Sequence, residues 1–316
     1  MLPIFSFIRH WMTSNYFTIL LYHRPKPELF EKHAKFLKKN YNIISLKNVY
    51  ESLKLNNLDL PPHSLIITID DGYKSNYSLL PVLRDYNINV TIFVLVGLFN
   101  TNRKIWNYVV NPLNKFENDR LKTLLNEDKN KYLMEKYCYY PRREYEKREM
   151  LNYSEIEQMK SHVDFQSHGM FHPLFTKCSE VELNFELNVS KELLEKITND
   201  EVFAIAYPYG RFGSREIKAA RYAGYNLGRI ANLYCLNHIN DNPMILKAIN
   251  IEDKESIHDV ERKLALAQII TILCSFLYRE SSRNRNRLLK RIGYILLPGF
   301  QNFIENKNIR ARTNFY

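Results

Sequence analysis

The stretch IITIDDGYKS, residues 66–75, places two adjacent carboxylates and a glycine directly after an apolar run. Four residues that are apolar or β-branched precede Asp70 and Asp71, which is the pattern of a buried strand. An Asp-Asp-Gly sequence after a strand has a plain interpretation as a turn, because aspartate caps its own backbone and glycine accepts a positive φ. Taken alone, the stretch favours the turn.

Apolar runs alternate with helical patterns along most of the chain. Strands that are almost unbroken apolar runs between helices favour a parallel sheet covered on both faces, and so an α/β fold. Seven or eight such units favour a closed or nearly closed barrel, although periodicity alone does not separate a barrel from an open sheet. The predicted strands lie at 17–23, 41–46, 64–69, 90–97, 163–168, 202–208, 225–230 and 244–251, and the helices at 27–40, 46–54, 76–87, 154–162, 179–197 and 214–224.

Two segments depart from this alternation. Residues 101–150 are rich in Lys, Asn, Glu and Tyr without a clean period, so we expect a partly helical insertion on the surface. Residues 261–316 contain an apolar helix candidate followed by a basic segment. The predicted organisation is a barrel over residues 1–260 that carries the insertion, with a basic amphipathic helical tail over 261–316.

The charge of the chain is concentrated near its C-terminus. Residues 279–316 contain nine lysines and arginines against two glutamates, which accounts for +7 of the formal charge of +11. A nucleic-acid-binding core is expected to carry a basic face of its own. The composition of the main body therefore argues against a nucleic-acid partner.

Cysteine usage and hydropathy indicate the compartment. The four cysteines are far apart and form no C-x-x-C pair, which is typical of reduced, structural thiols. The first residues lack a basic leader followed by an apolar run and a cleavage site, so we expect no signal peptide. No run of about 18 apolar residues is present to span a bilayer. The simplest location is cytoplasmic.

Polar residues at the ends of the predicted strands form one chemically sensible set. In barrels of this kind the chemistry lies at the C-terminal ends of the strands. Those ends offer His23, the pair Asp70 and Asp71, the two histidines of SHGMFHP at 167–173, and the turn YPYG at 207–210.

His168 and His172 are four residues apart, and the glycine and proline beside them indicate a loop rather than a helix. Two imidazoles and one carboxylate make a three-ligand site with an open position, the pattern of a catalytic zinc. Adjacent residues at a strand end diverge, so one aspartate is able to bind metal while its neighbour takes a proton from water. Taken alone the histidines are more simply surface groups; combined with the aspartate pair they favour hydrolysis of an amide or ester.

Three motifs resemble those of the polysaccharide deacetylases of carbohydrate esterase family 4. TIDDGY at 68–73 is similar to their first motif, T-F-D-D-G. SHGMFHP resembles their second, H-[ST]-x-x-H-P, with Gly169 where Ser or Thr is usual, and AYPYG at 206–210 resembles their third. The resemblance covers roughly residues 16–252, much of 101–150 excepted.

The resemblance implies an irregular (β/α)7-type barrel that removes acetyl groups from N-acetylated sugars. Carried over by position, Asp70 becomes the general base. The metal ligands become Asp71, His168 and His172, and the expected cofactor is a divalent metal, most simply Zn²⁺. The backbone N–H of Tyr209 would help to stabilise the tetrahedral oxyanion.

Two departures from the family pattern concern proton transfer. The arginine of the third motif, which helps to orient the base, is replaced by Ala206, and GRIANLY lacks the aspartate that partners it. The branch that resembles poly-N-acetylglucosamine deacetylases also has Y-P-Y-G without this arginine, so its loss need not abolish activity. In that branch an early strand ending in Tyr-His supplies the general acid, which makes His23 the candidate here. The alternative is a solvent-facing histidine at a strand end.

The expected function is therefore metal-dependent N-deacetylation of an acetylated amino-sugar glycan or glycan intermediate. A catalytically weak or inactive carbohydrate-binding protein is the alternative, because the arginine–aspartate pair is missing. The tail also allows two interpretations. Its basic amphipathic segment at 263–300 suggests peripheral contact with an anionic membrane surface at the inner face, and a helix packed on the barrel with a solvated basic face explains it equally well. Oligomeric state is not predicted.

Overall fold

The structure is a computed structural model, and it describes residues 15–55, 60–110, 114–231 and 235–284, with side chains described up to residue 274. Two compact units divide the chain. Residues Thr68–Gly228 form one unit, and the segments before and after them form the other.

The strands follow the predicted alternation and pair mainly in parallel. Their hydrogen-bonded order is β10-β1-β3-β4-β5-β6-β7-β9, with β2 beside β3 and β8 beside β1. Of the pairings whose register is given, only β1 with β8 is antiparallel. The strands of the described residues are β1 (Tyr16–Tyr22), β2 (Asn42–Ile43), β3 (Ser64–Asp71), β4 (Val90–Val94), β5 (Val163–Ser167), β6 (Ala204–Ala206), β7 (Leu227–Ile230), β8 (Asn237–His238), β9 (Leu246–Lys247) and β10 (Ile249–Asn250).

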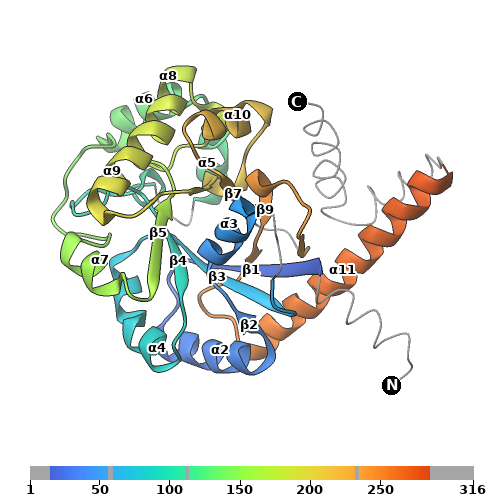
Figure 1. Cartoon of the computed structure of the whole chain (residues 1–316). Coiled ribbons are helices and arrows are strands. Elements are labelled where there is room, and N and C mark those ends of the chain that lie inside the picture. The colour runs from blue at the N-terminus through green and yellow to red at the C-terminus, as the bar shows by residue number, and fades with distance from the viewer. Residues whose placement is uncertain (1–14, 56–59, 111–113, 232–234, 285–316) are drawn as a thin grey trace. The chain divides into compact units, whose positions relative to one another are not determined.

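The helices connect these strands and cover the sheet (Figure 1). Three of them begin with capping boxes, at Ser45, Asn152 and Ser179. Serine and asparagine are typical residues at this position, because their side chains accept hydrogen bonds from the free backbone N–H groups of the first turn. The helices of the described residues are α2 (Pro27–Asn40), α3 (Leu46–Lys54), α4 (Leu80–Asp85), α5 (Lys115–Leu121), α6 (Asn126–Tyr137), α7 (Tyr153–Met159), α8 (Glu180–Asn184), α9 (Ser190–Thr198), α10 (Ser214–Tyr222) and α11 (Ile257–Asn284), with short helical turns η1 (Lys74–Leu79), η2 (Trp106–Tyr108), η3 (Phe175–Lys177), η4 (Phe185–Val189), η5 (Pro208–Gly210) and η6 (Pro243–Ile245).

Together these elements confirm the predicted α/β class, a nearly closed barrel with a helical C-terminal region. All eight residues of β3 and all five of β4 are buried, as their apolar sequences predict. The predicted strand over 90–97 is shorter than expected, because the chain turns after Val94. The predicted strand over 41–46 shrinks to the two residues of β2.

One predicted helix, over 179–197, is interrupted. It divides into α8, the single π-helical turn η4 and α9. Such turns insert one extra residue into an α-helix and are frequent at functional sites. Hydrophobic periodicity does not reveal them, because the apolar face continues on both sides of the turn.

The segment predicted as an insertion, residues 101–150, is partly helical and shares a hydrophobic cluster with the sheet region. α5, α6 and η2 belong to it. Its buried side chains include Trp106, Leu121 and Leu133, which join Tyr73 and Leu95 of the sheet region in one hydrophobic cluster. The insertion is therefore attached firmly beside the C-terminal end of β3.

The predicted apolar helix at 263–279 lies within α11. Its inner face is buried at Leu264, Ala267 and Cys274. No helix in the described part of the chain is long and apolar enough to cross a membrane. The remainder of the predicted tail, 285–316, lies outside the described residues.

Candidate metal centre

Strand register brings the candidate ligands to one edge of the sheet. Asp71 pairs with Val94 of β4, Val94 pairs with Ser167 of β5, and Ser167 pairs with Ile205 of β6. The ends of four parallel strands are thus level, and His168 follows directly. Segments about one hundred residues apart in the chain therefore place their polar side chains together.

The ligand atoms of Asp71, His168 and His172 all lie within 4.8 Å of one another, and all three side chains are buried. His168 Nε2 lies 3.6 Å from Asp71 Oδ1, and His172 Nε2 lies 3.7 Å from the same oxygen. The imidazole rings are 4.8 Å apart between centroids and nearly perpendicular, with an interplanar angle of 65°. The structure thus brings together the three predicted ligands.

These residues fit a divalent metal. Asp71 Oδ1 is buried and has no hydrogen-bond partner among the described residues, and the two imidazole nitrogens are too distant to serve as donors. A buried carboxylate oxygen without a partner is costly. A cation bound to nitrogen and oxygen at about 2.0–2.2 Å would satisfy it.

The second aspartate lies at the same place. Asp70 is 3% exposed, and its Oδ2 is 3.7 Å from His168 Nε2. Asp71 has a positive φ of 70°, so the alternation of side chains along β3 ends there. As a result the carboxylates of both Asp70 and Asp71 reach the same nitrogen, His168 Nε2. The cluster thus contains two carboxylates and two imidazoles.

The orientation of His168 is set by a backbone group. Its Nδ1 is 2.8 Å from the carbonyl oxygen of Ala206, at the end of β6. A carbonyl oxygen only accepts, so Nδ1 carries the proton and Nε2 presents its lone pair to the cluster. Such hydrogen bonds fix the tautomer of metal-binding histidines. Sequence reasoning missed this contact, because a backbone carbonyl leaves no mark in the residue pattern.

Tyr209 and Trp106 pack around His172. The ring centroids of Tyr209 and His172 are 4.5 Å apart, and those of Trp106 and Tyr209 are 6.2 Å apart. The indole Nε1 of Trp106 donates to the backbone oxygen of His172 at 3.3 Å. His172 and Tyr209 both have positive φ, 59° and 58°. These contacts hold two residues with strained backbone, the candidate ligand His172 and its neighbour Tyr209.

A comparison with known families identifies the chain. A family model described as "Polysaccharide deacetylase" matches residues 57–228, more than half of the sequence. The chain belongs to the polysaccharide deacetylase family. All of the residues just described lie inside the matched segment.

Individual relatives are distant. The curated protein named "Putative polysaccharide deacetylase YxkH", of Bacillus subtilis (strain 168), is 25% identical over 247 residues, which cover 71% of each chain. A solved structure of the Streptococcus pyogenes deacetylase PplD in complex with acetate is 22% identical, with a TM-score of 0.58 over 79% of this chain and 99% of that one. A de-N-acetylase from Aggregatibacter actinomycetemcomitans is 17% identical, with a TM-score of 0.57 over 79% and 100%. The structural likenesses show the fold.

One departure from the family's motifs has a steric explanation in this chain. Gly169, where Ser or Thr is usual, has a φ of +85°, and a Cβ there would lie 2.8 Å from Glu186 Oε2. That carboxylate accepts hydrogen bonds from the backbone N–H groups of Met170 and Phe171, at 2.6 and 3.2 Å. Glu186, from η4, therefore occupies the space that a side chain at 169 would need, and holds the loop that carries His172.

Burial controls the protonation of two groups near the cluster. It raises the pKa of Glu186 to about 7, against the two backbone donors that lower it. Burial, together with Asp71 and Tyr108, raises the pKa of Tyr73, so that its hydroxyl stays protonated. The hydroxyls of Tyr73 and Tyr108 are 2.6 Å apart. A protonated Tyr73 hydroxyl therefore lies near Asp71.

The predicted general acid lies in the other compact unit. His23 follows β1 directly and is half-buried. Its role in proton transfer stays a prediction. Ala206, which stands where the third motif usually has arginine, places a buried methyl group at the end of β6.

Proposed function

We propose that this chain is a metal-dependent hydrolase that removes N-acetyl groups from an amino-sugar-containing glycan or glycan intermediate. The observation that carries the proposal is the cluster of Asp71, His168 and His172, with their ligand atoms within 4.8 Å, beside the buried carboxylate of Asp70. Membership of the polysaccharide deacetylase family supports it. So do similar structures described as a deacetylase with acetate and as a de-N-acetylase.

In the proposed reaction each side chain has one role. A bound divalent ion, for which zinc suits the ligands best, lowers the pKa of water and polarises the amide carbonyl. Asp70 removes the proton from the attacking water. The backbone N–H of Tyr209 donates to the oxygen on which negative charge develops. His23 protonates the amine as the C–N bond breaks, which leaves acetate and a free amino sugar.

Two neighbouring variants test the division of roles. Asp71→Asn should lower the bound metal well below one ion per chain, because the carboxylate ligand is lost. Asp70→Asn should retain the metal while acetate release falls by about 10²–10⁴-fold, the usual contribution of a general base. Metal content is measured by mass spectrometry, and acetate is measured with chitooligosaccharides, poly-N-acetylglucosamine fragments and lipid-linked amino sugars. The control is Asp85→Asn, at an exposed position of α4.

The outcomes separate the alternatives. Unchanged turnover in Asp70→Asn would refute the assignment of the base. The second candidate function, a weak or inactive carbohydrate-binding protein, is favoured by Ala206 in place of the arginine. It predicts glycan binding by the zinc-loaded protein without acetate release from any substrate of the panel.

We further propose a cytoplasmic location with peripheral contact to an anionic membrane through residues 263–300. On α11 three apolar side chains at helical spacing are exposed: Leu266, Ile269 and Leu273, at 42%, 55% and 43%. The sequence that follows is rich in arginine and lysine. An apolar stripe continued by basic residues is typical of helices that bind the surface of anionic membranes.

A further inference from the structure

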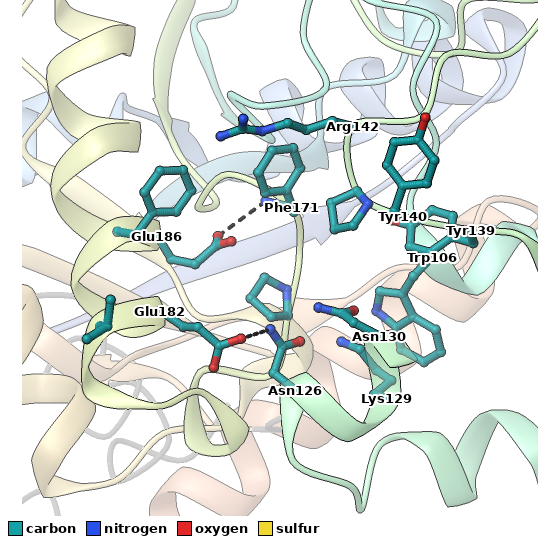
Figure 2. A pocket seen from close by; sticks show the side chains of 14 residues that line it. Trp106, Asn126, Lys129, Asn130, Tyr139, Tyr140, Arg142, Phe171, Glu182 and Glu186 are labelled. Carbon is teal, nitrogen blue, oxygen red and sulfur yellow. Dashed lines mark hydrogen bonds between the residues drawn. The ribbon is translucent and has the colours of Figure 1, made fainter. Parts of the chain in front are cut away.

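A cavity lies against the loop that carries the candidate ligands His168 and His172. Its volume is about 490 Å³, within the range of small-molecule sites. The walls come from the insertion, from Phe171 and Pro173 on either side of His172, and from α8 and η4 (Figure 2). Trp106 connects the cavity with the candidate metal centre. Its side chain lines the cavity, and its indole N–H donates to the backbone oxygen of His172.

Aromatic rings form much of the lining. Trp106 and Tyr140 line it on the side of the insertion, and Phe171 and Phe185 on the other. The latter two rings are nearly parallel, at 11°, with centroids 6.4 Å apart. Tyr140 is 49% exposed, although it is a large ring in a packed part of the fold. Flat aromatic walls suit a ligand with an apolar face.

A buried ammonium faces this cavity. Lys129, on α6, is only 3% exposed, and its Nζ lies 4.9 Å from the centroid of the Trp106 ring. Its side chain makes no hydrogen bond or ion pair with any described residue, and burial lowers its pKa to about 8. The carboxylates of Glu182 and Glu186 act on it only at longer range. A buried charge without a direct partner is costly unless a ligand supplies one.

The carboxylates of Glu182 and Glu186, which also line the cavity, already accept some hydrogen bonds. Glu182 accepts from Asn126 at 2.7 Å and from the backbone of Ser179 at 2.8 Å. Glu186 uses Oε2 for the backbone of the metal-binding loop, and no described residue donates to its Oε1. The cavity therefore offers a buried amino group, Lys129 Nζ, and an oxygen to which no described residue donates, Glu186 Oε1, between aromatic walls.

The charges that line the cavity balance. Lys129 and Arg142 are basic, and Glu182 and Glu186 are acidic. A strongly anionic or cationic ligand would meet repulsion from one pair, whereas hydroxyl groups donate to the carboxylate and accept from the ammonium. A pyranose ring combines such hydroxyls with an apolar C–H face that packs on aromatic rings.

We propose that this cavity binds one uncharged sugar unit of the glycan, adjacent to the unit that is deacetylated, with its hydroxyls between Lys129 Nζ and Glu186 Oε1 and its apolar face against the aromatic walls. The identity of the sugar as part of the substrate rests on the proposed function. Its binding in the cavity does not, and the two are tested separately.

Binding is measured first, by calorimetry on the full chain in the presence of chelator, with N,N′-diacetylchitobiose as the probe. Lys129→Met and Tyr140→Ala should each weaken binding about tenfold or more, because a hydrogen bond to a charged group and a stacking surface are lost. The controls are Lys218→Met and Tyr222→Ala, an exposed lysine and an exposed tyrosine on α10 that do not line the cavity. They should bind as the unaltered chain does.

Kinetics then connect the cavity with the substrate. In Lys129→Met, KM for an oligosaccharide should rise about tenfold with little change in kcat, while KM for N-acetylglucosamine itself should not change. Chitobiose binding that is lost in the cavity variants while acetate is never released would uphold the cavity and refute the proposed function. Normal binding and kinetics in both cavity variants, or preferential binding of inorganic phosphate by the unaltered chain, would overturn the cavity inference.

Discussion

At the scale of single residues, some contacts of the site can be predicted from the sequence and others cannot. Asp70 and Asp71 are adjacent in sequence, and the positive φ of Asp71 lets both carboxylates reach His168, which regular strand alternation would prevent. The partner of His168 is the carbonyl of Ala206, a group present in every residue type. The replacement of the third-motif arginine by Ala206 therefore leaves this hydrogen bond of His168 in place.

Gly169 should tolerate no side chain. In Gly169→Ser the Cβ would approach Glu186 Oε2, and φ of +85° would strain any L-residue. We expect a loss of about 1–3 kcal/mol in the free energy of unfolding, together with weaker zinc binding, because the loop carries His172. Urea unfolding and zinc titration measure the two effects.

The matched control is Gly213→Ser, at the N-cap of α10, where φ is −147° and serine is a favoured capping residue. It should leave stability and zinc affinity unchanged or slightly improved. Equal stability of the two serine variants would contradict the steric role assigned to Glu186.

Glu186 should make stability depend on pH. Its pKa rises from the usual 4.5 to about 7 through burial, so between these values the native state binds more protons than the unfolded state. The free energy of unfolding should therefore fall as pH rises from 4.5 to 7, by roughly 3 kcal/mol in total. The nearby Lys129 ammonium and Glu182 carboxylate act on the group in opposite directions.

The variant Glu186→Gln keeps an acceptor oxygen for the loop and has no titrating proton. Its unfolding free energy should lack this fall between pH 4.5 and 7, measured by urea denaturation at several pH values. Identical slopes for the variant and the unaltered chain would show that Glu186 does not titrate in this window.

At the scale of elements, one helical turn connects the helical layer with the metal loop. η4 separates α8 from α9, and Ser190 closes the turn by donating to the carbonyl of Glu186. The turn gives Glu186 its position behind Met170 and Phe171. The insertion acts from the other side through Trp106. Two elements outside the sheet therefore hold the loop that carries His172.

A charged substitution in the exposed apolar stripe of α11 tests the proposed membrane contact. Ile269→Glu should reduce co-sedimentation with vesicles that contain phosphatidylserine by severalfold, because a carboxylate cannot enter the apolar interface and repels anionic lipid. Binding by the unaltered chain should weaken with salt. Circular dichroism should be unchanged, since the side chain is 55% exposed.

The control places the same substitution on an exposed apolar residue elsewhere, Val181→Glu on α8, which is 80% exposed. It should bind vesicles normally. If the unaltered chain stays in solution with anionic vesicles at low salt, the proposed membrane contact is wrong.

At the scale of the whole molecule, the candidate chemistry is concentrated in one part of the chain. The segment matched by the family model, 57–228, nearly coincides with the compact unit Thr68–Gly228. That unit contains Asp70, the proposed metal ligands and the cavity lined by Trp106 and Lys129. His23 and α11 belong to the flanking unit.

Metal binding should stabilise the fold measurably. The ligands come from two distant segments of the chain, so the unfolded state does not hold them together. Zinc at a hundredfold excess over its dissociation constant adds about 2.7 kcal/mol, which corresponds to a rise of a few degrees in unfolding temperature. Calorimetry with zinc and with chelator measures the difference, and Asp71→Asn should abolish it. Equal unfolding temperatures for the unaltered chain would refute a metal site.

The sequence by itself determined the class of fold and the identity of the candidate ligands. Buried strands are unbroken apolar runs, and helices begin at capping residues, so local chemistry marks both kinds of element. The positions of Asp71, His168 and His172 at strand ends predicted a metal site before any distance was known. The interrupted helix at 179–197 escaped prediction, because a π-turn leaves the apolar pattern nearly unchanged.

Only the tertiary structure decided what surrounds the ligands. The register of β3 to β6 makes the strand ends level, and this brings Ala206 to His168. Trp106 and Glu186 reach the loop of His172 from segments that show no motif of their own. Such contacts join residues far apart in sequence, and their geometry depends on how whole elements pack. No local pattern of residues encodes that packing.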